Sequence, residues 1–347
     1  MENESSLLAY LAPRLTSPGE DTATDALAFI LNKSEACCRA LESLLSDQDF
    51  AISRLTRFQT QVTYEDGSRP DMVGYDGENR KRLLVESKFW AALRDGQASR
   101  YFGQLEQPGP GLLLFIVPGS RIETLWPEIR RQMETGEHSA QLQSEATLDR
   151  MRRARVASSE NRLMLVSWDL LLERLVAAVP ADSQVASDVQ QLRGFVEEQD
   201  LDAFQPLQRE ELSPSLARRV LSLERLINDV VARGDERDWM SQGKSIKYEE
   251  MCFGRYFGLR DGHGEDMWLG AQFWMWARRA DTPLWLWIDS SSPISAHQLR
   301  SLENPIDVFE EDDGLYVPIR LLVGVEYHHV LDDVVDQLRR IAAILVA

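Results

Sequence analysis

Residues 69–89 read RPDMVGYDGENRKRLLVESKF, and they carry the clearest secondary-structure pattern in the chain. The stretches at 69–75 and 82–89 are rich in β-forming residues, and the turn residues DGEN at 76–79 separate them. Residues 50–63 alternate between apolar and polar side chains and precede a further turn, EDGS. The sequence therefore predicts a three-stranded antiparallel meander.

Helices and buried strands are predicted around this meander. Apolar residues recur at helical spacing before and after it, and two continuous apolar runs have the composition of strands buried on both faces. The expected helices cover residues 20–46, 90–105, 122–160 and 168–178, and the expected strands cover 112–117 and 162–167. Lys33 and Ser34 are polar residues within the first helical region, which therefore forms either one long helix or two. Residues 1–178 are thus predicted to form one α/β domain.

The second half of the chain is predicted to form a separate α+β domain. A linker is expected at residues 179–189, and the second domain at 190–347. Five of the nine tryptophans lie between residues 268 and 287, where the pattern predicts two strands around a turn at Pro283. Because both faces of these strands are apolar, the tryptophans are expected in the core. Exposed tryptophans that stack on bases or on a partner protein are the alternative.

The composition limits the classes of protein that this chain can belong to. Its 347 residues carry a net charge of −18, which argues against a nucleic-acid coat protein but leaves room for a local basic groove. The acidic excess is concentrated in the second half. No apolar run is long enough to cross a bilayer, and the N-terminus lacks the pattern of a signal peptide. We therefore expect a cytoplasmic protein with no membrane partner.

The candidate catalytic side chains lie in the meander itself and are those of Asp71, Glu86 and Lys88. Glu86 and Lys88 are two residues apart on one strand, so they project to the same face, and strand pairing would bring Asp71 toward Glu86. Two carboxylates form an oxygen-rich site for Mg²⁺ or Mn²⁺, and a neighbouring lysine can orient water or stabilise charge on a phosphate. The alternative is a surface hairpin with solvated charges. Against it, Glu86 and Lys88 end an apolar strand, where unpaired charges are costly.

This segment resembles the signature of the PD-(D/E)xK, or restriction-endonuclease-like, nuclease superfamily. The matching residues are Pro70, Asp71, Glu86, Ser87 and Lys88. The resemblance covers about residues 20–178 and implies a restriction-endonuclease-like core, which is a mixed sheet flanked by helices. It also implies that Asp71, Glu86 and the backbone carbonyl of Ser87 bind Mg²⁺ (or Mn²⁺). By the same resemblance, Lys88 positions the attacking water.

Residues on the flanking helices add to the resemblance. Asp25 occupies the place of an acidic residue that the superfamily often carries before the meander, and it would bind the metal directly or through water. Gln97 and Tyr101 match a Gln-x-x-x-Tyr pattern, share a helix face, and would support the site or contact the nucleic-acid backbone. Arg94 and Arg100, expected on the same helix, are candidate phosphate contacts, with solvated helix residues as the alternative.

The function that the resemblance implies is Mg²⁺-dependent hydrolysis of phosphodiester bonds, with DNA as the expected substrate. By family analogy, the protein is expected to act in anti-phage defence. The acidic second domain is expected to regulate the groove or to bind a protein partner, and a homodimer would allow both strands to be cut. Two alternatives stay open. One is a nuclease-like subunit that binds nucleic acid or protein and is inactive or needs a partner, and the other is an RNA-directed nuclease.

Overall fold

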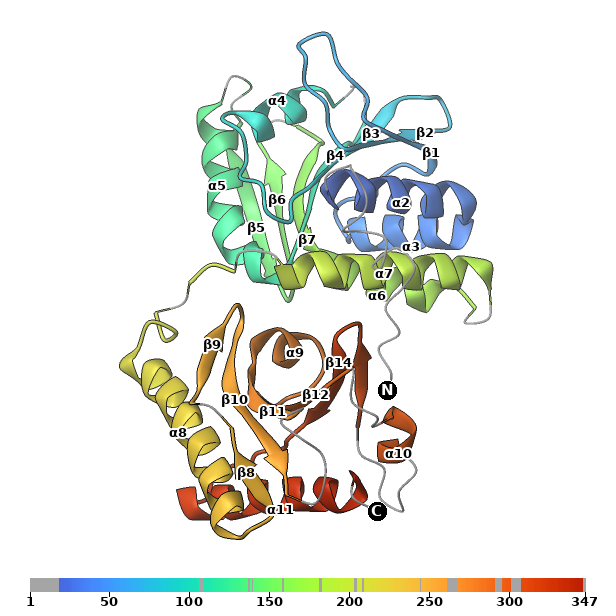
Figure 1. Cartoon of the computed structure of the whole chain (residues 1–347). Helices are drawn as coiled ribbons and strands as arrows, with labels where there is room; N and C mark the ends of the chain where they lie inside the picture. Colours follow the sequence, from blue (N-terminus) through green and yellow to red (C-terminus); the bar gives the residue numbers. More distant parts are fainter. Residues whose placement is uncertain are drawn as a thin grey trace. The chain divides into compact units, whose positions relative to one another are not determined.

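The computed structural model describes residues 19–105, 109–136, 138, 140–157, 159–180, 183–202, 205–207, 209–243, 245–260, 267–290, 295–300 and 307–345. The chain divides into two compact units, Met1–Pro206 and Leu207–Ala347 (Figure 1). The first unit is α/β and contains a mixed sheet, whereas the second contains an antiparallel sheet. Within the described ranges, no helix combines the length and the apolar character that a bilayer crossing requires.

The first unit is built on a mixed sheet. Its strands lie in the order β1 (Leu55–Thr60), β2 (Met72–Asp76), β3 (Lys81–Ser87), β4 (Leu112–Val117), β7 (Arg162–Ser167), β6 (Met151–Val156) and β5 (Leu142–Leu148). Strands β3, β4 and β7 run parallel to one another, and the remaining neighbours pair antiparallel. The predicted meander corresponds to β1–β3, and the two predicted buried strands correspond to β4 and β7. These predictions are confirmed.

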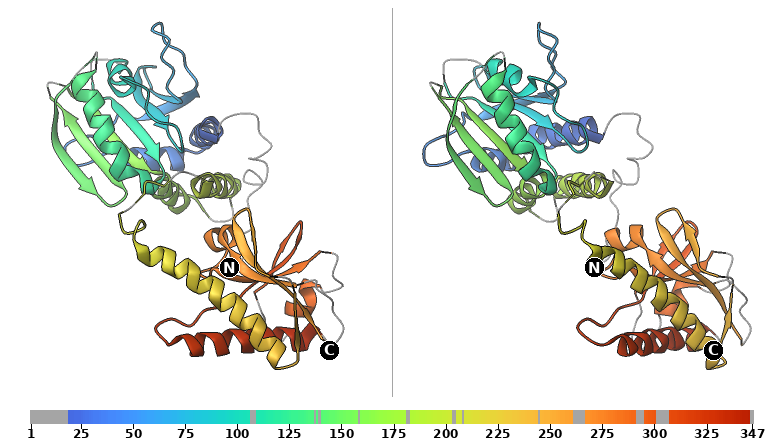
Figure 2. Two further views of the ribbon diagram at one scale, coloured as in Figure 1. Left: turned by 60° about the vertical axis from the view of Figure 1, so that its left-hand side comes forward. Right: turned by 90° about the vertical axis from the view of Figure 1, so that its left-hand side faces the viewer.

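Helices cover both faces of this sheet (Figure 2). One face packs against α2 (Gly19–Lys33), α3 (Glu35–Leu45), α6 (Trp168–Ala178) and α7 (Gln184–Asp202), and the other against α4 (Gln97–Gly103) and α5 (Ile122–Thr135). Successive residues of a strand point to opposite faces, so Leu83 and Val85 pack with the first layer and Leu84 with the second. Glu86, the next residue, therefore faces the layer that contains α4.

The region before the meander forms two helices rather than one. Ser34 separates them because its Oγ accepts a hydrogen bond from the Cys37 N–H at 3.2 Å and so caps α3. Of the two predicted arrangements, the structure has the pair of helices.

The prediction of a mostly helical region at 122–160 is wrong in its second half. Helix α5 ends at Thr135, and β5 and β6 follow. The polar composition that suggested a helix comes from arginines of β6 that pair with carboxylates on other elements. These pairs are Arg152–Glu123, Arg153–Asp47 and Arg155–Asp49. A polar strand stabilised by such long-range pairs cannot be told from a solvated helix by its composition alone.

The boundary between the two units falls after Pro206 and not within residues 179–189 as expected. Helix α7, expected in the second domain, packs against α2 and α6 of the first unit. It buries Val189, Leu192 and Phe195 in the core between the helices and the sheet. This apolar contact keeps α7 with the first unit.

The second unit is built on an antiparallel sheet. Its strands lie in the order β13 (Phe309–Glu311), β14 (Gly314–Pro318), β12 (Leu284–Asp289), β11 (Met267–Gln272), β10 (Cys252–Leu259) and β8 (Met240–Gln242), and β9 (Lys247–Glu249) also pairs with β10. Helices α8 (Pro214–Glu236) and α11 (Tyr327–Leu345) pack on one face of the sheet. The shorter helices are α9 (Phe273–Arg278) and α10 (Ala296–Arg300).

The tryptophan-rich region is only partly the pair of strands that the sequence predicted. Trp285 lies on β12 and is buried, as expected for a core residue. Trp274 and Trp276 instead lie on α9, which connects β11 to β12, and Trp276 is exposed. The prediction failed here because a short helix whose faces are both apolar has the composition of a buried strand.

Candidate active site

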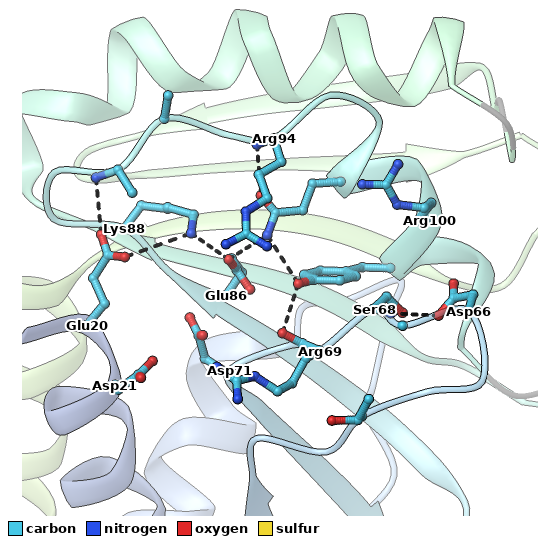
Figure 3. Close-up of a pocket in the computed structure, with 16 residues that line it drawn as sticks. Glu20, Asp21, Asp66, Ser68, Arg69, Asp71, Glu86, Lys88, Arg94 and Arg100 are labelled. Atoms are coloured by element: carbon cyan, nitrogen blue, oxygen red, sulfur yellow. Dashed lines mark hydrogen bonds and ion pairs between the residues drawn. The ribbon is translucent and has the colours of Figure 1, made fainter. Parts of the chain in front are cut away.

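The candidate site is a cavity of about 610 Å³ in the first unit. It lies where the start of β2, the end of β3, the first turn of α2 and the segment between β3 and α4 meet (Figure 3). Charged and polar side chains make up most of its lining. The lining residues are Glu20, Asp21, Thr63, Asp66, Gly67, Ser68, Arg69, Asp71, Glu86, Lys88, Ala91, Ala92, Arg94, Gln97, Arg100 and Tyr101.

Strand pairing brings Asp71 and Glu86 together, as the sequence predicted. The register of β2 and β3 places Met72 opposite Val85, so the preceding residue, Asp71, falls opposite Glu86. Opposed residues of an antiparallel pair point to the same face, and Figure 3 shows the two carboxyl groups directed toward each other. The backbone fixes Asp71, because the Ser87 N–H donates a hydrogen bond to Asp71 Oδ2 at 2.7 Å.

Lys88 and Gln97 both bind one oxygen of the Glu86 carboxylate. Lys88 Nζ lies 2.6 Å from Glu86 Oε1, and Gln97 Nε2 donates a hydrogen bond to the same oxygen at 2.6 Å. The other oxygen, Glu86 Oε2, is buried and has no hydrogen-bond partner among the described residues. Glu86 is therefore held in one orientation with its second oxygen free to accept a ligand.

The carboxylates of Asp71 and Glu86 are electrostatically strained. Burial, with the nearby charge of Glu86 as the second cause, raises the pKa of Asp71 to about 8. Burial also raises the pKa of Glu86, although the Lys88 ammonium opposes this shift. For Lys88, burial opposes the charged form, but the charges of Glu86, Glu20 and Asp71 outweigh it and raise the pKa. Lys88 is thus an ammonium at neutral pH, and the carboxylates lack sufficient compensating positive charge.

Gln97 and Tyr101 share one face of α4 and connect it to the site. Gln97 Nε2 also donates a hydrogen bond to Tyr101 Oη at 3.1 Å, and Tyr101 Oη donates to the carbonyl of Arg69 at 2.9 Å. Both side chains are buried. The predicted supporting role therefore has a geometric basis, because this chain of hydrogen bonds links Glu86 to the loop that carries Asp71.

Glu20, which was not predicted from the sequence, is the acidic residue of α2 that pairs with Lys88. Its Oε2 lies 3.9 Å from Lys88 Nζ. Asp25 is exposed and does not line the cavity, so the structure does not bring it to the other site residues as expected. Five residues at about 100° each place Asp25 roughly 140° around the helix from Glu20. The sequence feature that could have indicated Glu20 is its position in the first turn of the helix, because the start of α2 is the part that reaches the end of β3.

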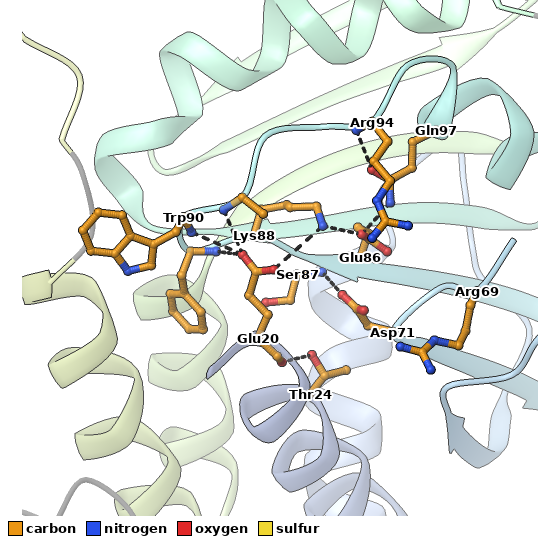
Figure 4. Close-up of polar contacts among 12 residues, drawn as sticks. Glu20, Thr24, Arg69, Asp71, Glu86, Ser87, Lys88, Trp90, Arg94 and Gln97 are labelled. Carbon is orange, nitrogen blue, oxygen red and sulfur yellow. Dashed lines mark hydrogen bonds and ion pairs between the residues drawn. The ribbon is translucent and has the colours of Figure 1, made fainter. Parts of the chain in front are cut away.

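Glu20 and Arg121 hold the backbone that follows Lys88, and Figure 4 shows the contacts of Glu20. Glu20 Oε1 accepts hydrogen bonds from three consecutive N–H groups, and the Arg121 guanidinium donates hydrogen bonds to carbonyls of the same segment. The N–H groups are those of Phe89, Trp90 and Ala91, at 2.6, 3.2 and 3.3 Å. The carbonyls are those of Lys88, Phe89 and Ala91, at 3.3, 2.9 and 3.2 Å. We call residues 88–91 with these two side chains the clamp.

The clamp also explains why α4 begins later than predicted. The predicted helix covered residues 90–105, but α4 begins at Gln97. Since side chains of Glu20 and Arg121 take the backbone groups of residues 88–91, these groups are not available to a helix. Arg94 consequently precedes α4 and only Arg100 lies on it, which corrects the expectation that both are on one helix.

Three arginines border the cavity without a carboxylate partner. Arg69, Arg94 and Arg100 line it, and none forms an ion pair with any residue that the structure describes. Figure 3 shows Arg94 and Arg100 beside the cavity. Elsewhere in this acidic chain, arginines such as Arg80 and Arg150 are paired with carboxylates. The guanidinium groups at the cavity are therefore available to an anionic ligand.

The residues present fit a divalent cation. Among the described residues, no group of three or more His, Cys, Asp and Glu side chains forms a complete metal cage. Mg²⁺ does not need one, because it usually binds one or two carboxylates and keeps several waters. Glu86 Oε2 is free, and the Ser87 N–H points to Asp71. In an extended strand the carbonyl lies on the same side as the N–H, so the Ser87 carbonyl also faces Asp71.

Comparison with protein-family models, with curated proteins and with solved structures gives no match for this chain. The chemistry of the site must therefore be inferred from its own residues. They provide a buried and a half-buried carboxylate, a buried ammonium and a border of unpaired guanidinium groups. This combination can bind a cation and a phosphate in adjacent positions.

Proposed function

We propose that the first unit is a metal-dependent nuclease domain with a restriction-endonuclease-like core, and that it hydrolyses phosphodiester bonds at the cavity. One observation supports this most strongly. The carboxylates of the half-buried Asp71 and the buried Glu86 face each other, and the Lys88 ammonium lies 2.6 Å from Glu86. A cation between the carboxylates would relieve their repulsion. It would also give the buried Glu86 Oε2, which has no hydrogen-bond partner among the described residues, a binding partner.

Each residue of the site has a role in this proposal. Asp71, Glu86 and the Ser87 carbonyl would hold Mg²⁺ or Mn²⁺, which supplies Lewis-acid stabilisation of the phosphate and a more acidic water. Lys88 is protonated, so it donates a hydrogen bond to the attacking water or to a phosphate oxygen and does not accept a proton. Gln97 keeps Glu86 in position.

The reaction balances without a further reactant. The water oxygen forms a bond to phosphorus while the bond from phosphorus to the leaving oxygen breaks, which gives a phosphate monoester and a hydroxyl. The water's proton passes to solvent or to Glu20, the carboxylate on the far side of Lys88 from Glu86, and the leaving oxygen takes a proton from solvent. The clamp holds Lys88 in place while this occurs.

The arginines at the border of the cavity favour a nucleic-acid substrate, and the proposed substrate is DNA. Arg69, Arg94 and Arg100 offer guanidinium groups that can bind successive phosphates of a backbone. The net charge of −18 would repel a polyanion from most of the surface, so binding would depend on this small basic border. Such binding should weaken steeply as salt is raised.

The test is cleavage of plasmid, linear DNA and RNA by the purified full chain with Mg²⁺ or Mn²⁺. Glu86→Ala and Lys88→Ala should each reduce the rate by at least about a hundredfold. Glu78→Ala, which removes an exposed carboxylate of the same hairpin, should cut like wild type. Cleavage that persists in both site variants, or a folded wild type that cuts none of these substrates, would contradict the proposal. If the protein cleaves only RNA, then RNA and not DNA is the substrate.

A further inference from the structure

Trp90 is unusual among the tryptophans of the first unit. Its side chain is 52% exposed, whereas Trp126 and Trp168 are buried at 7% and 1%. Trp90 directly follows the Lys88–Phe89 pair, and Figure 4 shows its indole on the opposite side of Lys88 from Gln97 and Arg94. A large aromatic surface is thus presented to solvent within two residues of the proposed catalytic lysine.

The backbone beneath Trp90 is rigidly held. Glu20 accepts its N–H at 3.2 Å, and Arg121 binds the carbonyls of the residues on either side, Phe89 and Ala91. Phe89 is itself fixed, because its ring stacks on Trp168 with 5.8 Å between centroids and 5° between planes. An exposed indole on an immobilised backbone loses little conformational freedom when a ligand covers it. It is therefore suited to bind a flat apolar surface.

The ligand that fits is a nucleobase whose strand runs across the cavity. On one side of Lys88 lie the unpaired arginines Arg69 and Arg94, which suit phosphates, and on the other lies the Trp90 indole. Stacking on an aromatic side chain together with cationic contacts to the backbone is how single strands are bound without sequence preference. In a duplex the base faces are covered by neighbouring bases, so Trp90 could stack only on an unpaired base.

We infer that the substrate of the site is a nucleic-acid strand that is unpaired next to the scissile phosphate, and that one of its bases stacks on Trp90. This inference rests on the proposed nuclease function and adds the substrate class to it. It makes Trp90 a residue that determines specificity.

The experiment compares one oligonucleotide sequence offered single-stranded and annealed to its complement, with Mn²⁺ and the full chain. Wild type should cut the single strand faster. Trp90→Ala should lower kcat/KM for the single strand about tenfold, and Trp90→Phe should restore most of it, because stacking needs an aromatic ring. Trp276→Ala is the matched control, since it removes a tryptophan that is 43% exposed in the second unit. It should leave both rates unchanged.

The possible failures are distinguishable. If wild type cuts both forms but Trp90→Ala cuts the single strand normally, or slows both forms equally, the inference is overturned and the proposed nuclease function stands. A wild type that prefers the duplex also overturns the inference. If folded wild type cuts neither form while circular dichroism shows an intact fold, the proposed function itself fails, and the inference with it.

Discussion

At the residue scale, the site consists of charges that the fold buries before any ligand neutralises them. Asp71 and Glu86 are forced together by the register of β2 and β3, and burial raises the pKa of both. Buried like charges are costly unless they are protonated or share a cation. The stability of the metal-free protein should therefore fall as pH rises. An ordinary salt-bridged acid has the opposite effect, because its contribution to stability is lost as pH falls.

The first prediction concerns this pH dependence without metal. The pKa of Asp71 is about 8 in the fold and about 3.9 when unfolded, so the folded state binds more protons between these values. The free energy of unfolding should fall as pH rises from about 4 to 8, and Asp71 alone contributes at most about 1.4 kcal/mol per pH unit. Glu86 acts in the same direction. Lys88, whose pKa is raised, stabilises the fold throughout this range and does not reverse the slope.

Urea unfolding at several pH values in the presence of a chelator measures the slope. Asp71→Asn should flatten it and should be more stable than wild type near pH 8. Asp25→Asn, which changes an exposed carboxylate of α2, should keep the wild-type slope. An Asp71→Asn protein with an unchanged slope would show that Asp71 does not carry the excess proton.

The second prediction concerns Arg121, which acts through the clamp and not on the substrate. Arg121→Gln should lower kcat by up to about a hundredfold with little change in KM, because a displaced Lys88 no longer meets the reacting phosphate. Arg121→Lys keeps the charge and should restore part of the rate. A rise in KM alone, or a loss of rate that merely follows a loss of folded protein in urea unfolding, would argue against positioning.

At the element scale, the β2–β3 hairpin has its own buried ion pair. Asp76 Oδ2 accepts hydrogen bonds from Arg80 Nε and Arg82 Nε, both at 3.0 Å, and Asp76 and Arg82 are buried. Burial opposes the charged form of Asp76, but the hydrogen bonds from Arg80 and Arg82 outweigh it and hold the pKa well below its usual range. This ion pair fixes the hairpin end opposite the site.

The third prediction follows from that pair. Asp76→Asn should destabilise the protein by roughly 3 kcal/mol, because it removes the carboxylate charge from the buried pair with Arg82. Glu78→Gln is the matched control, since Glu78 pairs with Arg80 at the surface and contributes at most about 0.5 kcal/mol. Denaturant unfolding compares the two. Equal effects would mean that the buried pair is no stronger than the exposed one.

The meander could be predicted because its signals are local. Turn residues, alternation along β1 and the two-residue spacing of Glu86 and Lys88 are all readable from short stretches of sequence. The contacts of Glu20 and Arg121 with Lys88 could not be found in this way, because folding alone brings these residues together. Asp25 was selected in place of Glu20 for the same reason. The later start of α4 is a consequence of those long-range contacts.

At the scale of the whole molecule, the limits of the first unit depend on α7. Its apolar side chains are buried with those of α2 and α6, so the unit extends to Pro206. Composition could not reveal this, because residues 179–189 have the character of a linker although α7 begins within them at Gln184. The apolar face of α7 has no partner until the tertiary fold is formed.

The fourth prediction tests this boundary with fragments. Residues 1–206 should fold with one cooperative thermal transition, because they contain every helix of the core around the sheet. Residues 1–178 lack α7 and should be several kcal/mol less stable, since the surface that Leu192 and Phe195 cover becomes exposed. Circular dichroism melting compares the fragments. If the 1–178 fragment is as stable as the 1–206 fragment, the boundary lies in the expected linker at residues 179–189.

The central claim is that Asp71 and Glu86 bind one divalent cation beside Lys88. Calorimetric titration of the full chain with Mn²⁺ tests it most directly. The claim requires that wild type binds Mn²⁺ at a site for which Mg²⁺ competes. Asp71→Asn and Glu86→Gln should each abolish this binding. Lys88→Ala should retain it, because the lysine repels the cation and does not bind it. Wild-type protein that binds no Mn²⁺, or binding that survives in both carboxylate variants, would contradict the claim.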